Sequence, residues 1–463
     1  MNSSKLIILT VVAVLLLSGA TAYGQVRIEW IGPGAPTAIS ADGTVVAGNT
    51  NGEYETFRWT ADTGIEPLGM CSVCVLGRGA GGPDISADGR FISATILGQD
   101  STYVTPGRWS EEFGWEECMP PPPPDGSLFD EAYGSAWGIS DDGSTVVGLY
   151  WLGGTAHGFA WNPTDGPMGM GSTVGNSRIN DANADGSVLV GWDEAPFGTW
   201  LPTVWENGTI THLTETESFC LANAVTPDGN MIGGSSSAGT GVRQAAIWIR
   251  NGDTWEENLL GTLPGTVNPF GEAIVNDISP DGTIIVGINS FNPGSSAGFI
   301  YTLQDGMMDI MDLLTDAGVT VPAGLSIASL NGISADGKHI CGIAVQTVFP
   351  WGTEGFIIHL DDVSAVPEAS VAFALEPSFP NPFNPSTTIP VVMGRDGTAQ
   401  LEIFDSAGRR VRTLHNGMLP AGRHEFIWNG RDEHQMQVSS GVYFSRMSDD
   451  SGASLNRSMV LVK

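Results

Sequence analysis

The chain has 463 residues, which is too long for one ordinary domain. It carries 51 Asp plus Glu against 19 Lys plus Arg, and this acidity excludes a nucleic-acid partner, because phosphate binding needs clustered cations. With 41% hydrophobic residues, the chain can bury a core, so global disorder is also excluded. The 62 glycines follow no Gly-x-y period, which excludes collagen and favours short strands joined by tight turns.

Residues 1–24 are predicted to be a signal peptide. Lys5 supplies a positive charge, residues 6–17 form an apolar run, and Ala20-Thr21-Ala22 offers a small-residue cleavage site. The run is too short to span a membrane as a helix, and no second candidate follows, so no transmembrane helix is predicted. We therefore expect an exported protein, and an uncleaved membrane anchor is the alternative.

Five cysteines follow the predicted signal peptide. An odd number in an exported chain excludes a complete disulfide framework. Cys71-Ser-Val-Cys74 resembles half of a zinc or redox site, but no second Cys or His pair stands at a matching distance. A local disulfide among Cys71, Cys74 and Cys118 is therefore favoured over a metal or redox centre.

A short motif, Ser/Thr/Asn-x-Asp-Gly after an apolar residue, recurs through most of the chain. Seven copies occupy residues 40–43, 86–89, 140–143, 183–186, 226–229, 279–282 and 334–337. Asp-Gly between apolar runs predicts a hairpin, because glycine adopts a positive φ without steric cost. A third apolar run follows with an aromatic residue at one position in six copies, and then a fourth short run. Each copy is therefore predicted to form four strands.

The ends of this array predict how it closes. The turn glycines are 43 to 55 residues apart, close to the length of one four-stranded propeller blade. The seventh copy ends after its third strand at Leu360, whereas Val26–Ile31 precedes the first copy as an unpaired fourth strand. Pairing these two segments leaves no bare sheet edge. We therefore predict an all-β, seven-bladed β-propeller over residues 25–361, closed by its N-terminal strand, with an open solenoid as the alternative.

The repeats also resemble known families. Ile139-Ser-Asp-Asp-Gly-Ser-Thr-Val-Val-Gly148 and His157-Gly-Phe-Ala-Trp161 resemble the extracellular HAF repeat family, with Gly158 where that family usually has Ala. Ser279-Pro-Asp-Gly282 is similar to propeller repeats of periplasmic translocation proteins. The resemblance implies a propeller and an extracellular setting, and it supplies no catalytic residue.

One repeat has the spacing of a calcium site. Asp181-x-Asn183-x-Asp185-Gly186 matches the opening of a calcium loop, but Trp192 stands where the bidentate Glu would lie. Because other repeats share this register, an Asp-capped hairpin turn is favoured and calcium is the alternative. No other cofactor is expected, and no catalytic motif is found in the sequence.

Aromatic and acidic residues gather where the second strand of two repeats ends. In the usual blade geometry these positions share the face opposite the Asp-Gly turns, so the sequence predicts a ligand site there. Aromatic rings beside carboxylates suit sugar stacking or peptide capture, and packing against neighbouring loops is the alternative. The candidate residues are Tyr150, Trp151, Trp192, Asp193 and Glu194.

After a linker at residues 362–375, residues 376–463 are predicted to form a small β-sandwich. Prolines between Pro380 and Pro385 are too dense for a central strand and mark its start. Alternating apolar runs separated by turn residues follow them, and the acidic excess of the chain lies almost entirely before this segment.

This segment resembles the type A C-terminal sorting domain of proteins exported by the type IX secretion system, which has an immunoglobulin-like fold. The matching stretches are Phe379-Pro-Asn-Pro-Phe-Asn-Pro-Ser-Thr-Thr388, Ile403-Phe-Asp-Ser-Ala-Gly-Arg-Arg-Val411, Leu419-Pro-Ala-Gly422, Trp428-Asn-Gly430 and Ser440-Gly-Val-Tyr-Phe444. The resemblance implies that the type IX secretion machinery is a partner. It also implies a secreted or cell-surface location in a Gram-negative-type bacterium.

Together these observations favour a non-enzymatic, exported propeller that binds an extracellular glycan or protein. The alternative is a secreted polysaccharide hydrolase or lyase, which would use propeller carboxylates as acid and base.

Overall fold

The computed structural model describes residues 26–51, 55–71, 81–98, 103–119, 134–196, 198–214, 219–238, 242–267, 271–292, 294–302, 305–347, 352–360, 374–375, 383–393, 397–405, 409–420, 422–449 and 454–461. The chain forms two compact units, Met1–Asp362 and Val363–Lys463. The predicted signal peptide lies outside the described residues. Among the described residues, no helix is both long and apolar enough to cross a membrane.

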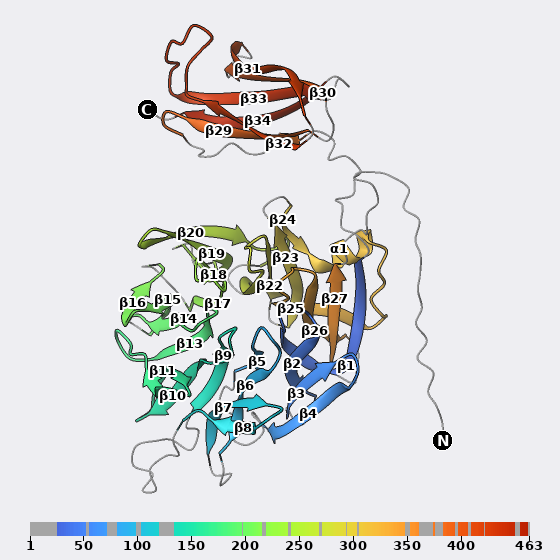
Figure 1. The fold of residues 1–463 in the computed structure, drawn as a ribbon. Helices are drawn as coiled ribbons and strands as arrows, with labels where there is room; N and C mark the ends of the chain where they lie inside the picture. Colours follow the sequence, from blue (N-terminus) through green and yellow to red (C-terminus); the bar gives the residue numbers. More distant parts are fainter. Residues whose placement is uncertain are drawn as a thin grey trace. The chain divides into compact units, whose positions relative to one another are not determined.

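The first unit is a β-propeller of seven four-stranded blades (Figure 1). Blades 1 to 3 contain β1 (Val26–Ile39), β2 (Val45–Thr50), β3 (Glu55–Thr60), β4 (Gly64–Cys71); β5 (Asp84–Ile85), β6 (Phe91–Leu97), β7 (Val104–Ser110), β8 (Gly114–Glu117); and β9 (Gly134–Ile139), β10 (Val146–Leu152), β11 (Thr155–Asn162), β12 (Gly166–Gly169). Blades 4 and 5 contain β13 (Ser177–Ala182), β14 (Val188–Glu194), β15 (Trp200–Glu206), β16 (Thr209–His212); and β17 (Leu221–Val225), β18 (Met231–Ser236), β19 (Gln244–Asn251), β20 (Thr254–Gly261). Blades 6 and 7 contain β21 (Glu272–Ile278), β22 (Ile284–Asn292), β23 (Ser295–Thr302), β24 (Gly306–Asp309); and β25 (Leu325–Ile333), β26 (His339–Gln346), β27 (Thr353–Leu360).

Strand β1 closes the ring, which confirms the predicted role of the N-terminal strand. Its first half pairs with β27, from Val26 opposite Leu360 to Pro33 opposite Glu354. Its second half pairs with β2, so one strand is the outer strand of blade 7 and the inner strand of blade 1. The sequence suggested two separate strands. The register instead shifts between Trp30 and Gly32, where a φ of 109° at Gly32 lets the strand bend and continue.

The repeated motif forms the hairpin turn between the first two strands of every blade. In blade 1, the Ser40 hydroxyl accepts a hydrogen bond from Val45 N at 3.0 Å and donates to Asp42 Oδ1 at 2.7 Å. Asp42 Oδ1 also accepts from Thr44 N at 3.0 Å, and Gly43 has a φ of 73°. Related contacts recur in the other six turns, with Asn183 and Thr226 replacing Ser in two of them. The motif therefore encodes a self-capped turn.

The glycine that ends the second apolar run is needed for a different reason, because a side chain there would clash with the inner strand. In blade 3, a Cβ at Gly148 would lie 2.0 Å from the carbonyl oxygen of Ser135 on the neighbouring inner strand. In blade 4, a Cβ at Gly191 would meet Arg178 O at the same distance. The two strands approach closely because the inner strand contains a β-bulge at this level.

A helix that the sequence did not predict follows blade 6. Helix α1 (Ile310–Asp316) begins after Asp309, whose carboxylate accepts a hydrogen bond from Met311 N. Ile310, Leu313 and Leu314 are buried in the core that joins blades 6 and 7. The short apolar run at Ile310–Asp316 therefore forms a two-turn helix that covers the end of blade 6.

The second unit is an immunoglobulin-like β-sandwich. Its sheets have the orders β28-β29-β32 and β31-β30-β33-β34. Between the sheets, Trp428 is fully buried, lies 4.9 Å from the Tyr443 ring and donates its indole N–H to Arg431 O. The first strand lies inside the predicted linker, because residues 374 and 375 pair with β29. The strands are β28 (Ala374–Leu375), β29 (Thr387–Met393), β30 (Gly397–Asp405), β31 (Arg410–Leu419), β32 (Gly422–Trp428), β33 (Gly441–Asp449) and β34 (Ser454–Leu461).

Candidate functional site

A central channel of about 430 Å³ lies between the inner strands of the blades. Every blade contributes the residue three positions before its turn motif, and in six blades this residue is the extra residue of a β-bulge. A bulge turns a side chain away from the regular pleat, here into the channel lining. These residues are Thr37, Pro83, Trp137, Asn180, Asn223, Asn276 and Asn331.

Four of these residues form a ladder of asparagines across blades 4 to 7. Asn180 Nδ2 donates to Ala222 O at 2.7 Å and to Asn223 Oδ1 at 3.2 Å. The pattern repeats from Asn223 to Asn276 and onward, and the last amide in the ladder donates to Pro36 O of blade 1 at 2.6 Å. The ladder therefore satisfies the polar channel wall internally and joins successive blades.

Aspartates in alternate blades make a second set of links between blades. Asp84 accepts from Ile85 N at 2.8 Å and from Ile139 N of the next blade at 2.9 Å. Asp181 and Asp277 make the same pair of contacts in blades 4 and 6. Burial raises the pKa of Asp84 to about 6 and that of Asp277 to about 7. Because both oxygens of each carboxylate hold backbone amides, these aspartates have a structural role.

Arg178 starts the asparagine ladder and lies close to the rings of two tryptophans. Its Nε donates to Asn180 Oδ1 at 2.6 Å, because Trp137 replaces the asparagine that would otherwise donate from blade 3. The guanidinium carbon is 3.5 Å from the Trp137 ring centroid and 5.6 Å from the Trp192 centroid. Burial lowers the pKa of Arg178 to about 9. Among the described residues, no carboxylate forms an ion pair with it.

Three aromatic rings, the first of them close to Arg178, contact one another in series. Trp192 is buried and stacks on Trp200, with ring centroids 4.5 Å apart and an interplanar angle of 16°. Trp200 meets Phe219 edge-on at 5.3 Å. Trp200 is partly exposed and Phe219 is 47% exposed. We call Trp192, Trp200 and Phe219 the aromatic platform.

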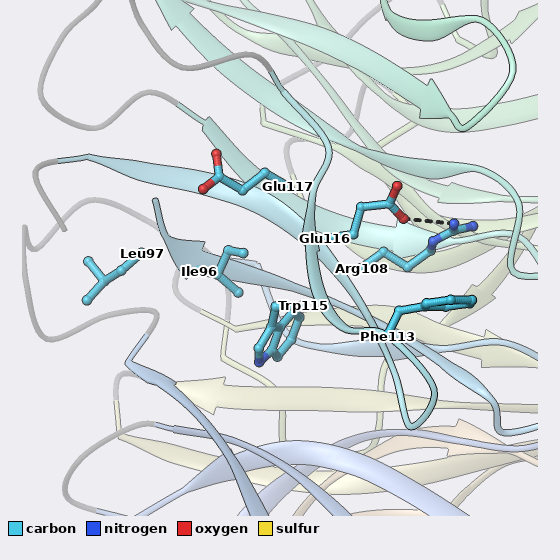
Figure 2. Close-up of a pocket in the computed structure, with 7 residues that line it drawn as sticks. All are labelled: Ile96, Leu97, Arg108, Phe113, Trp115, Glu116 and Glu117. Atoms are coloured by element: carbon cyan, nitrogen blue, oxygen red, sulfur yellow. Dashed lines mark hydrogen bonds and ion pairs between the residues drawn. The ribbon is translucent and has the colours of Figure 1, made fainter. Parts of the chain in front are cut away.

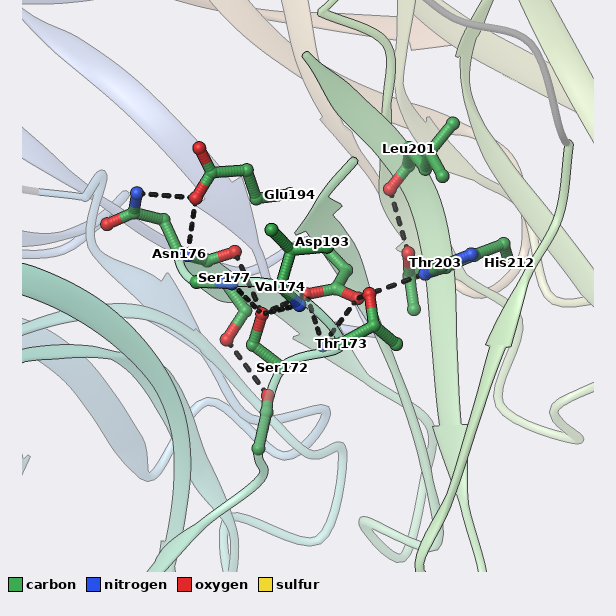
Figure 3. Close-up of polar contacts among 12 residues, drawn as sticks. Ser172, Thr173, Val174, Asn176, Ser177, Asp193, Glu194, Leu201, Thr203 and His212 are labelled. Atoms are coloured by element: carbon green, nitrogen blue, oxygen red, sulfur yellow. Dashed lines mark hydrogen bonds and ion pairs between the residues drawn. The ribbon is translucent and has the colours of Figure 1, made fainter. Parts of the chain in front are cut away.

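Of the predicted ligand residues, Asp193 and Glu194 make internal hydrogen bonds (Figure 3). Asp193 is fully buried and accepts from Ser172 Oγ at 2.6 Å, Thr173 N at 3.0 Å and His212 Nε2 at 3.0 Å. Burial raises the pKa of this carboxyl, but those hydrogen bonds lower it more, so the net shift is downward. Glu194 accepts from Asn176 N and Nδ2 at 2.7 Å. Both acids thus hold the loop before β13.

The other predicted ligand residues separate into two places. Trp192 belongs to the aromatic platform. Tyr150 and Trp151 lie at the end of β10 in the preceding blade, partly exposed, and the Tyr150 ring packs on His157 at 5.3 Å. Ligand binding by these residues stays a prediction, and Trp192, itself buried, is the one that stacks on a partly exposed aromatic residue, Trp200.

A larger hollow lies beside blade 2 (Figure 2). It has a volume of about 660 Å³ and is lined by Ile96, Leu97, Arg108, Phe113, Trp115, Glu116 and Glu117. Arg108 there is neutralised by Glu116 at 2.9 Å and also donates to Gly143 O at 2.8 Å. Phe113 is 75% exposed. This hollow therefore offers apolar surface, with its cation already paired.

The remaining predicted site residues have their polar atoms engaged or lie outside the described part. Asp185 Oδ1 accepts from Ser187 N and Oγ, and Asn183 Oδ1 accepts from Val188 N. With Asp181 bound to two backbone amides, the turn explains this motif, and calcium binding stays a prediction. Cys118 is a buried thiol outside any disulfide. The side chain of Cys71 and all of Cys74 lie outside the described residues, so a bond between them stays a prediction.

Comparisons with known proteins concern the fold. Residues 391–453 match the family model described as "FlgD Ig-like domain". Among curated protein sequences, none matches the chain. Similar solved structures include the β-propeller domain of the Trilobed protease from Pyrococcus furiosus, at 12% identity and a TM-score of 0.43, covering 72% of this chain and 99% of that chain. Prolyl oligopeptidase B from Galerina marginata has 12% identity and a TM-score of 0.43, covering 81% of this chain and 57% of that one.

TolB from Acinetobacter baumannii is also similar, with 14% identity and a TM-score of 0.37, covering 58% of this chain. This chain spans 61% of the length of that TolB. The strand topology and the C-terminal match together establish a β-propeller followed by an immunoglobulin-like domain.

Proposed function

We propose that this protein is an exported, non-enzymatic binding protein whose propeller captures an extracellular glycan. The aromatic platform carries the proposal, because Trp200 and Phe219 present ring surface to solvent. A sugar ring stacks on an aromatic face through its C–H groups and excludes water there. The second tryptophan beneath Trp200 holds that ring in place, which lowers the entropy lost on binding.

The internal roles of the channel acids favour binding over hydrolysis. A carboxyl with a raised pKa is a candidate general acid. Here, however, Asp84, Asp181 and Asp277 each bridge the backbone amides of two blades, so the oxygens of these three carboxylates are occupied. The proposal therefore assigns no catalytic residue.

Replacing Trp200 by Ala tests this proposal. We expect the chain without its signal peptide to bind at least one sugar in a panel of plant and bacterial oligosaccharides, measured by calorimetry. Trp200→Ala should weaken that binding about fivefold, since aromatic stacking contributes about 1 kcal/mol. Phe113→Ala is the matched control at the blade 2 hollow and should have no effect. Turnover of a panel sugar would show that the protein is an enzyme. If the protein binds no sugar of the panel, glycan capture is refuted.

The C-terminal domain is proposed to direct export. Its resemblance to type IX sorting domains and the predicted signal peptide support passage through both membranes of a Gram-negative-type bacterium. Deleting residues 376–463 should leave the propeller in the periplasm, measured by protease accessibility on intact cells. Fusing residues 363–463 to a periplasmic reporter is the converse control and should bring the reporter to the surface. Normal surface delivery of the truncated chain would restrict this domain to a structural role.

A further inference from the structure

Arg178 differs from the other arginines that stack on aromatic rings in the propeller. Arg108 lies 4.9 Å from the Trp161 centroid, and Glu116 neutralises it at 2.9 Å. Arg250 lies 4.4 Å from the Trp255 centroid and pairs with Glu206 at 3.1 Å. Both also donate to a backbone carbonyl of a turn glycine. Arg178 has the same stacked geometry, yet its charge is not matched by any carboxylate among the described residues.

The hydrogen bonds of Arg178 leave most of its donors available. A guanidinium carries five N–H donors in one plane. Only Nε has an acceptor among the described residues, the neutral amide oxygen of Asn180. The rings of Trp137 and Trp192 flank the guanidinium and restrict its plane. Since leaving a partly buried cation unpaired costs free energy, an anion at Nη1 and Nη2 would stabilise the site, and a carboxylate fits this fork with two parallel hydrogen bonds.

We propose that Arg178 binds the carboxylate of a uronic acid in an acidic saccharide. This inference rests on the proposed glycan capture and specifies its chemical class. The Trp192 ring is near both groups, with its centroid 5.6 Å from the guanidinium carbon and 4.5 Å from the Trp200 centroid. These distances are within the length of a disaccharide. One sugar unit therefore places its carboxylate on Arg178 while the adjoining unit stacks on Trp200.

The charge of the whole chain restricts how acidic this ligand is. With a formal net charge of −32, the protein repels polyanions at long range. Asp181, Asp193 and Glu194 also lie within a few residues of the site along β13 and β14. A single carboxylate next to a neutral sugar matches one unpaired guanidinium beside an uncharged aromatic platform. The ligand class is therefore an oligosaccharide with one uronic acid next to a neutral sugar, and polyuronates are excluded.

Cellobiouronic acid and cellobiose provide a matched pair of probes, because they differ only in a carboxylate and a hydroxymethyl group. We expect the chain without its signal peptide to bind cellobiouronic acid at least tenfold more tightly than cellobiose in calorimetry. Arg178→Gln retains an amide donor for Asn180 and removes the charge. It should weaken binding of the acid at least tenfold and binding of cellobiose less than twofold. Arg250→Gln, the same change at a neutralised arginine, should leave both affinities unchanged.

Arg178→Lys provides a second variant, which retains the charge and should lose less affinity for the acid than Arg178→Gln. Near-ultraviolet circular dichroism of both variants checks that the tryptophans remain packed. Equal binding of the two sugars by the unmodified chain would overturn the role of Arg178 while leaving glycan capture intact. If the chain binds neither of these sugars and no other sugar of the panel, glycan capture itself is refuted. If Arg178 binds a free peptide carboxylate and the chain shows no preference between the two sugars, the site belongs to a protein ligand. That result would overturn the proposal of a saccharide ligand.

Discussion

Removing residues 26–31 is expected to lower the melting temperature of the propeller by at least about 10 °C or to cause aggregation. These residues are the first half of β1 and form the outer strand of blade 7. Their loss would expose the backbone edge of β27 from Phe356 to Leu360. It would also remove apolar side chains from the core, including Val26, which is 9% exposed, and Trp30, which lies 5.9 Å from Phe356. A buried apolar side chain contributes about 1.5–3 kcal/mol.

A deletion of equal length elsewhere separates ring closure from chain length. Residues 363–368 adjoin the boundary between the two units, so their removal should leave the melting temperature within about 2 °C of the parent. Trp30→Ala, which shortens nothing, should destabilise the propeller by about 2 kcal/mol through the lost contact with Phe356. Calorimetric scans of all three variants measure these differences. A 26–31 deletion that melts like the parent would mean that β1 does not hold the ring closed.

The propeller could be predicted because its repeat encodes local structure. Each Ser/Thr/Asn-x-Asp-Gly turn satisfies its own polar groups, so seven copies spaced by one blade length indicate seven hairpins without any knowledge of distant contacts. The continuity of β1 could not be predicted in this way. Gly32-Pro33-Gly34 has the composition of a break, and only the two partner strands keep it extended. Helix α1 was missed for a similar reason, since seven residues are too few for a periodic signal.

The candidate site was less accessible from sequence, because it depends on a β-bulge. The bulge turns Trp137 and Asn180 into the channel, and no local pattern marks which residue of a strand is the extra one. Aligning the repeats on their turns would have shown asparagine at the same place in four successive blades, at 180, 223, 276 and 331. Arg178 and Trp137 belong to two different blades, so no fixed spacing along the sequence predicts that they stack. Trp192 was predicted because it lies near the end of β14 beside two acids, whereas Trp200 begins β15 and was not singled out.

Two sets of aspartates are expected to confine the maximum stability of the propeller to mildly acidic pH. In the channel, burial raises the pKa of Asp84 to about 6 and of Asp277 to about 7, and it raises that of Asp181 well above its usual value. In the turns, burial raises the pKa and hydrogen bonds lower it, with a net downward shift. The turn residues with this shift are Asp42, Asp142, Asp185, Asp228, Asp281 and Asp336.

The signs of these shifts define two pH windows. Because the channel carboxyls bind protons more tightly in the folded state, the free energy of unfolding falls as pH rises from about 4 to 7. The turn carboxyls bind protons less tightly in the folded state, so their contribution is complete above about pH 4 and is lost below it. Burial lowers the pKa of His359, which opposes the first trend below about pH 6.5. Three channel carboxyls outweigh this single histidine.

We therefore expect the melting temperature to be highest near pH 4.5–5 and roughly 5 to 10 °C lower at pH 8, since each unit of pKa shift corresponds to about 1.4 kcal/mol. Asp277→Asn removes one channel titration and should make the fall between pH 5 and 8 shallower, although losing one acceptor for a backbone amide lowers stability at every pH. Asp281→Asn, in the turn of the same blade, should change only the loss below pH 4. Calorimetric scans from pH 3 to 8 compare the three proteins. A melting temperature that rises steadily from pH 5 to 8 would show that the amide contacts of the channel aspartates dominate over their burial, so that these carboxyls remain charged in the folded propeller.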